Sequence, residues 1–142
     1  MFFQIDPSNG LAIYDQVVRQ VKFAVAGGVL RTGELVPSVR ELARELAINP
    51  NTVARAYRCL QDGGVLETVR GQGLVVTAQA RERCLADRLQ LIRSRLQQVL
   101  LEAKQSRLAP VELRAIVEEE LQAGWLFPIR DPTVERRSGS PE

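Results

Sequence analysis

Asparagine and threonine side chains lie at the start, and arginine side chains on the outward face, of a helix that the sequence predicts to begin at Asn49 and Pro50. The helix should end at the two glycines that follow residue 62, and its candidate contact residues are Asn49, Asn51, Thr52, Arg55 and Arg58. Asparagine and arginine carry the paired donors and acceptors that read the edges of bases, and threonine and arginine also bind phosphates. Any one of these side chains could simply be solvated on a helix surface. As a set around one helix start, they predict contact with nucleic acid.

Enzyme chemistry and metal binding are disfavoured by what the 142-residue chain lacks. It contains no histidine, which removes the commonest general base and the commonest zinc ligand. Cys59 and Cys84 are too few for a zinc cage or a disulfide framework. We expect both to be small buried residues, the alternative being a redox or ligand switch. We therefore predict no enzymatic activity, no metal site and no cofactor.

The overall charge neither favours nor excludes a nucleic-acid partner. The 19 Lys and Arg residues against 17 Asp and Glu give a net charge of +2, so a basic surface must come from the placement of side chains. No apolar run approaches the roughly 18 residues of a membrane span, and the first residues carry no signal-peptide pattern. The sequence thus predicts a cytoplasmic protein with no membrane partner.

A second helix should come just before the one at Asn49. Ser38 and Glu41 form a capping box that opens a helix ending near Ala47, only two residues before the next helix begins. Two helices joined by so tight a turn are typical of a helix-turn-helix, whose second helix enters the major groove of DNA. We therefore include Ser38 and Arg40, at the start of the first of these helices, among the candidate DNA contacts.

A β-hairpin should follow the helix-turn-helix. Residues 65–69 and 74–77 have strand character, residues 35–36 could add a brief third strand, and the hairpin loop contains Arg70, Gly71, Gln72 and Gly73. A narrow loop with one cation can probe a minor groove or a phosphate. We therefore add these four loop residues to the candidate DNA contacts.

A heptad seam runs along the helix predicted after residue 78. Its apolar residues alternate steps of four and three: Leu85, Leu89, Ile92, Leu96, Val99 and Ala103. A further helix begins at Pro110, has its own apolar face and should end at Gly124. The seam could be covered by that helix or by a second chain. We favour a homodimer, because helix-turn-helix proteins commonly read two half-sites with twofold symmetry.

The predicted fold is mostly α with a small β-wing. Residues 1–78 should form a winged helix-turn-helix that binds DNA, and residues 79–127 a short two-helix dimerisation domain. Residues 128–142 are rich in Pro, Ser, Gly and charge, so we expect a disordered tail there.

Five segments of residues 10–78 make up a multi-part signature. They are YDQV (14–17), GELVPSVRELA (33–43), NPNTVARAY (49–57), GGVL (63–66) and GQG (71–73). With them the chain resembles the N-terminal domain of the GntR family of bacterial transcription regulators. The resemblance implies DNA contacts at Arg40, at Asn49, Asn51, Thr52 and Arg55, and at Gly71 and Gly73. Two departures are Ala12, where relatives often have Pro, and Ala47 in the turn, where they commonly have Gly.

The short helical C-terminal part is similar to that of the YtrA-like subfamily of GntR regulators. That resemblance implies dimerisation and, often, repression of genes for membrane transporters. We thus predict a homodimeric repressor that binds an inverted-repeat operator in double-stranded DNA. The alternative is a winged-helix adaptor that binds another protein, although its recognition helix would usually expose apolar residues. The operator, the regulated genes and any small-molecule effector are not identified by the sequence.

Overall fold

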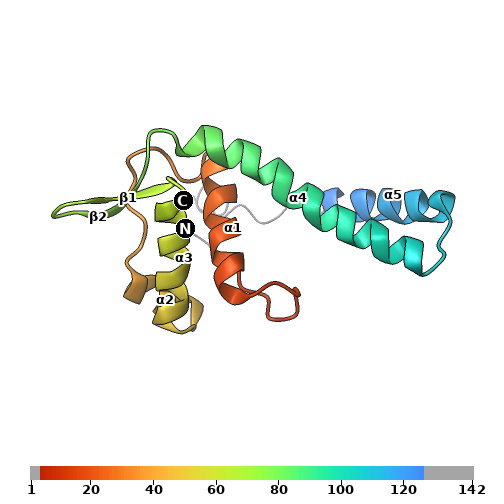
Figure 1. The fold of residues 1–142 in the computed structure, drawn as a ribbon, viewed down its shortest axis with the longest axis horizontal. Helices are drawn as coiled ribbons and strands as arrows, with labels where there is room; N and C mark the ends of the chain where they lie inside the picture. Colours follow the sequence, from red (N-terminus) through yellow and green to blue (C-terminus); the bar gives the residue numbers. More distant parts are fainter. Residues whose placement is uncertain (1–3, 127–142) are drawn as a thin grey trace, which may run out of the picture. The chain divides into compact units, whose positions relative to one another are not determined.

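A computed structural model of the chain describes residues 4–126. The elements, in order, are α1 (Ile13–Ala26), α2 (Val39–Leu46), α3 (Pro50–Asp62), β1 (Leu66–Val69), β2 (Gly73–Val76), α4 (Ala80–Gln105) and α5 (Pro110–Leu126), as Figure 1 shows. This order confirms the predicted fold class, an N-terminal winged helix-turn-helix followed by two helices. The predicted disordered tail, residues 128–142, lies outside the described residues. The chain divides within α4, between Arg93 and Ser94, into two compact units.

The core of the first unit forms where α1 packs against α3. Val17, Val21 and Val25 recur every four residues on one side of α1, and all three are buried. The facing side of α3 is made of the residues that the helical period selects, namely Val53, Ala56, Tyr57 and Leu60, all buried. The two helices lie side by side in Figure 1. This core holds α3 in place and leaves its other side free for solvent.

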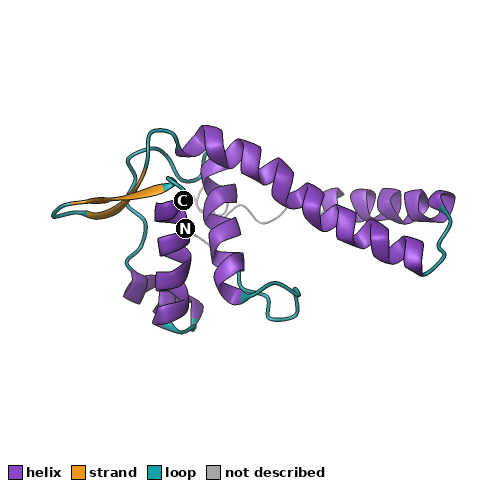
Figure 2. Cartoon of the chain, viewed as in Figure 1, coloured by secondary structure: helices purple, strands orange, loops and turns teal. Residues whose placement is uncertain are grey.

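The wing is a two-stranded antiparallel sheet in which Leu66 pairs with Val76 and Val69 with Gly73. Figure 2 shows this hairpin extending away from the helices. The predicted third strand at residues 35–36 is reduced to a single bridge between Leu35 and Val75. It is fixed by hydrogen bonds from the Val36 amide to the Leu74 carbonyl and from the Val76 amide to the Glu34 carbonyl, both 3.0 Å. Pro37 follows at once and cannot donate to a longer ladder.

The first turns of α4 belong to the first unit. Cys84 is fully buried in the core, as predicted. Cys59, in contrast, is exposed on α3, so the prediction that it is buried was wrong. Arg83 donates from Nη1 to the Gly63 carbonyl at the end of α3 (2.7 Å), which satisfies a carbonyl that the helix itself leaves without a partner.

The second unit contains the rest of α4 together with α5. The helix α5 continues through Gly124 to Leu126, so the predicted end at that glycine was wrong. Most apolar side chains among residues 94–124 are exposed, and they include Leu96, Leu100, Leu101, Val111, Ile116 and Leu121. Leu113 is half-buried.

Candidate nucleic-acid interface

The turn between α2 and α3 sets the direction of α3. Ala47 ends α2 with φ 54° and ψ 45°, the left-handed conformation that closes many helices. The Ile48 amide then donates to the Ala43 carbonyl (3.0 Å). Asn49 caps α3 by accepting the Asn51 amide at its Oδ1 (2.8 Å), and Pro50 occupies the first turn. The predicted cap and proline are both confirmed, and α3 starts where the sequence places it.

The outward side of α3 is polar and cationic. Asn51, Arg55 and Arg58 are exposed, while Thr52 and Ala54 are half-buried. Asn49 is exposed too, although its side-chain oxygen is engaged in the helix cap. Its amide nitrogen still provides donors, so capping does not remove Asn49 from the candidate contacts.

One part-buried hydrogen bond joins the segment just before α2 to α3. Tyr57 is 2% exposed, and its hydroxyl donates to the carbonyl of Pro37 at 2.7 Å. Burial raises the pKa of the Tyr57 hydroxyl far above its ordinary value, with a smaller contribution from nearby Glu41 and Glu45. The phenol therefore stays protonated and remains a donor. This bond ties the segment before α2 to α3.

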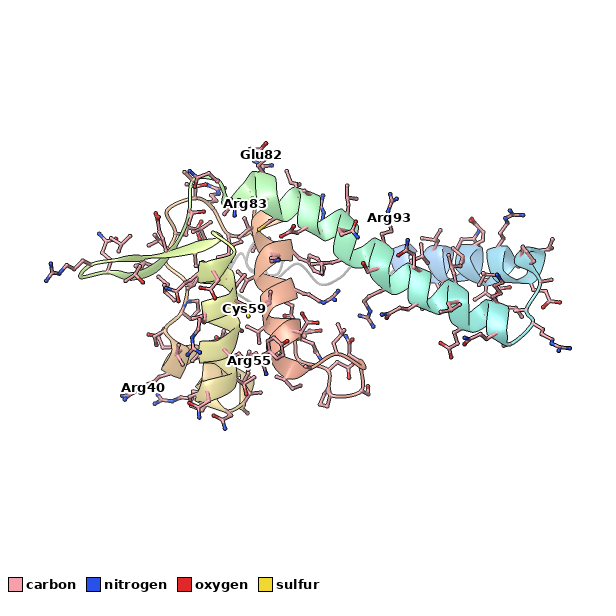
Figure 3. All side chains as sticks on the ribbon, in the orientation of Figure 1. Arg40, Arg55, Cys59, Glu82, Arg83 and Arg93 are labelled. Atoms are coloured by element: carbon pink, nitrogen blue, oxygen red, sulfur yellow. The ribbon has the colours of Figure 1, made fainter. Side chains whose placement is uncertain are left out.

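Ser38 and Arg40 come just after Pro37, whose carbonyl accepts this hydrogen bond. The Ser38 hydroxyl oxygen accepts the Glu41 amide at 3.1 Å, as the capping box predicts, and its own proton remains available to another acceptor. Arg40 is exposed on the first turn of α2. In Figure 3, Arg40 and Arg55 lie toward the same end of the winged helix, while Cys59 is further along α3 and Arg83 is near the start of α4.

The loop of the wing exposes all four predicted contacts, Arg70, Gly71, Gln72 and Gly73. The Gln72 amide donates to the Val69 carbonyl at 3.0 Å and closes the turn. Gly71 has φ +81° and Gly73 φ +127°, conformations that residues with a Cβ rarely adopt. The glycines are therefore required by the backbone of the loop, and they keep it narrow as well.

A groove separates the wing from the start of α2. It has a volume of about 660 Å³, and its lining includes Ser38, Glu41, Tyr57, Gln72 and Gly73. It thus joins candidate contacts from α2 and from the wing, 34 residues apart, along one surface.

A second hollow lies beside α3 and contains a residue that sequence reasoning missed. It measures about 330 Å³ and is lined by Ile13, Tyr14, Asn51, Thr52 and Arg55. The guanidinium carbon of Arg55 lies 3.8 Å from the centre of the Tyr14 ring. In the sequence Tyr14 stands three and seven residues before Val17 and Val21, which is the spacing of a core residue of a helix, and nothing there connects it with an arginine on another helix.

The described part of the chain was found to contain neither a group of metal-ligating residues nor a helix that could cross a membrane. Among residues 4–126, no three His, Cys, Asp or Glu side chains are grouped so that they could hold a metal ion. The helices of the same range are all too short or too polar to cross a membrane.

Comparison with known proteins agrees with this geometry. Residues 13–76 match the family model for bacterial regulatory proteins of the gntR family. The HTH-type transcriptional repressor YtrA of Bacillus subtilis is 36% identical over 115 residues, which cover 81% of this chain and 86% of YtrA. The similarity therefore extends beyond the winged helix into the C-terminal helices.

Solved structures show the same architecture. A transcriptional antiterminator from Listeria monocytogenes is 32% identical with a TM-score of 0.63, over 87% of this chain and 92% of that one. A GntR family transcriptional regulator from the same species is 28% identical with a TM-score of 0.61, over 79% and 97% of the two chains. Such relatives are regulators of transcription and not enzymes. The chain belongs to the GntR family of bacterial regulatory proteins and is a DNA-binding transcription regulator similar to YtrA.

Proposed function

We propose that this protein is a cytoplasmic repressor that binds an inverted-repeat operator as a homodimer. The observation that carries the proposal is the division of α3 into a fully buried apolar side and an exposed side with Asn51, Arg55 and Arg58. An adaptor that binds a protein would present apolar residues there, because the centre of a protein interface is depleted in charge. Repression is proposed from the similarity to YtrA, which is named a repressor.

In the proposed complex the exposed side of α3 lies in the major groove. Asn49, Asn51 and Arg58 are the residues that we assign to base edges, and Thr52 to a phosphate. Ser38 and Arg40 would contact the backbone from the start of α2. The wing loop, with Arg70 as its one cation, would follow the flanking minor groove.

The homodimer is proposed from the exposure of the heptad seam. Its five large residues, Leu85, Leu89, Ile92, Leu96 and Val99, are between 36% and 69% exposed in the single chain, and Ala103 is half-buried. Leu96 and Val99 remain about half exposed although α5 belongs to the same unit. Burying these five side chains in a dimer would contribute on the order of 5 kcal/mol per chain before the entropy of association is subtracted. We therefore propose that a second chain, rather than α5, covers the seam residues.

On this proposal residues 1–78 bind DNA and residues 79–127 dimerise.

The proposal is tested by binding of the purified protein to DNA from upstream of its own gene and to unrelated DNA of the same length, at one physiological salt concentration. A preference of about a thousandfold or more supports an operator, and footprinting should then give half-sites about one helical turn apart. Equal, weak and salt-sensitive binding to both would contradict sequence-specific regulation at that DNA and favour the adaptor.

The dimer is tested separately with Ile92→Asp. A charge at the centre of the heptad seam should give monomers by light scattering, and these should bind a full operator poorly while half-site binding persists. Gln90→Asp is the matched control, since Gln90 is exposed two residues away and outside the seam. An Ile92→Asp protein that is still dimeric would contradict the assignment of the seam.

A further inference from the structure

The contact between Arg55 and Tyr14 directs one cation of α3 toward α1. The guanidinium lies over the ring at 3.8 Å from its centre, a distance at which the aromatic face attracts a cation. Tyr14 is half-buried and packs against the core, so the ring is a fixed platform, whereas Arg55 is exposed. The side chain of Arg55 is therefore held to one side of α3.

The hollow next to this contact has the chemistry of an anion site. Arg55, Thr52 and Asn51 contribute a guanidinium, a hydroxyl and an amide to its lining, and no carboxylate belongs to that lining. The nearby Asp15 is instead engaged with Arg19 at 3.2 Å along α1. With one face on the ring, the guanidinium keeps the N–H groups at its edge for a planar or tetrahedral oxyanion.

We propose that Tyr14 is a positioning residue that holds Arg55 for a DNA backbone phosphate bound in this hollow, so that Arg55 does not read a base. The inference rests on the proposed entry of α3 into the major groove. Phosphates line both rims of that groove, and α1 packs against one side of α3. A guanidinium held toward α1 is placed at the rim and is withdrawn from the base edges at the centre of the groove. Thr52, in the same hollow, would donate its hydroxyl to the same phosphate.

The first test compares Arg55→Ala with the wild-type chain on two labelled duplexes of about 30 base pairs, one with the upstream sequence and one of random sequence. A lost phosphate contact should weaken binding to both duplexes by the same factor, about tenfold or more for each subunit. The slope of log affinity against log salt should fall by about 0.9 per subunit. Arg31→Ala, which removes an exposed arginine outside both hollows, is the matched control and should leave that slope unchanged.

The second test asks whether Tyr14 acts through Arg55. Tyr14→Leu removes the ring and should weaken binding to both duplexes by about two- to fivefold. Tyr14→Phe keeps the ring and should restore binding to within about twofold of wild type. In the Arg55→Ala background, Tyr14→Leu should cost nothing more, because the residue it positions is gone. A purely structural role would give the same loss in both backgrounds, and thermal unfolding of each variant separates loss of fold from loss of contact.

The results that would overturn the proposal differ from those that would overturn the function. If Arg55→Ala reduces the preference for the upstream duplex, Arg55 reads a base, and the phosphate assignment is wrong. If Tyr14→Leu and Arg55→Ala are additive, Tyr14 is not a positioning residue. If the wild-type chain shows no preference between duplexes but both variants behave as expected, sequence-specific regulation fails and the phosphate site stands. No binding of the wild-type chain to either duplex at low salt would overturn both.

Discussion

Replacing Ala47 with glycine should make the protein more stable, although it removes a methyl group. Ala47 has φ 54° and ψ 45°, a left-handed conformation that costs a residue with a Cβ about 1–2 kcal/mol. Its side chain is exposed, so removing the methyl group loses no buried apolar surface. The turn is held by backbone bonds, from the Ala47 amide to the Arg44 carbonyl (3.3 Å) and from the Ile48 amide to the Ala43 carbonyl (3.0 Å), and glycine keeps both.

Against this gain stands the larger chain entropy that glycine loses on folding, about 0.5–1 kcal/mol. The difference predicts a net stabilisation of about 0.5–1 kcal/mol. For a unit of this size, that raises the melting temperature by about 2–8 °C. Operator affinity should stay within about twofold, because the turn keeps its conformation and the recognition helix its direction.

The assay is thermal and urea unfolding followed by circular dichroism, at one protein concentration because a dimer makes stability depend on concentration. Ala86→Gly is the matched control: the same substitution at an exposed position inside α4 should lower stability by about 1 kcal/mol. If Ala47→Gly were neutral or destabilising while Ala86→Gly behaved as expected, the strain assigned to the turn would be wrong.

Three further predictions concern side chains of the first unit. Tyr57→Phe leaves the Pro37 carbonyl without its donor, so it should lower the unfolding free energy by about 1–2 kcal/mol in urea titrations; an unchanged midpoint would contradict the role of this bond. The exposed Cys59 should be alkylated in the native protein and the buried Cys84 only after unfolding, as mass spectrometry would show. Burial also raises the pKa of Cys84 from 9.0 to about 11, so the folded thiol keeps a proton that the unfolded one loses. Stability should therefore decline as pH rises from about 9 to 11, and less steeply in Cys84→Ala.

Helix starts could be predicted from the sequence because local chemistry decides them. Ser38 and Asn49 cap their helices with their own side chains, and Pro50 fits only the first turn of a helix. One helix end was predicted wrongly. Gly124 looked like a terminator, yet a single glycine in a helix costs only about 1 kcal/mol, and α5 continues past it.

The exposure of Cys59 follows from its position on α3. Cys59 precedes the buried Leu60 by one residue, which is a rotation of about 100° and enough to place its thiol in solvent.

Contacts between distant segments could not be predicted from the pattern of one helix. Tyr14 and Arg55 come from different helices, and their contact depends on how α1 packs against α3. The apolar period of α1 made Tyr14 a core residue, and the ring does pack on the core. The same ring also holds the cation, and a pattern in one helix carries no information about that.

The heptad seam and the recognition helix should act together although they share no residue. One winged helix contributes few phosphate contacts, and non-specific binding at physiological salt is weak, with dissociation constants of about 10⁻⁴–10⁻⁶ M. When a second copy is joined through the seam, its binding becomes intramolecular, and the gain depends on the effective concentration that the connection sets. Any change that separates the subunits therefore weakens binding to a two-half-site operator without touching a DNA contact. In the proposed dimer of so small a protein, the exposed leucines of α4 would thus determine operator affinity as much as the arginines of α2 and α3 would.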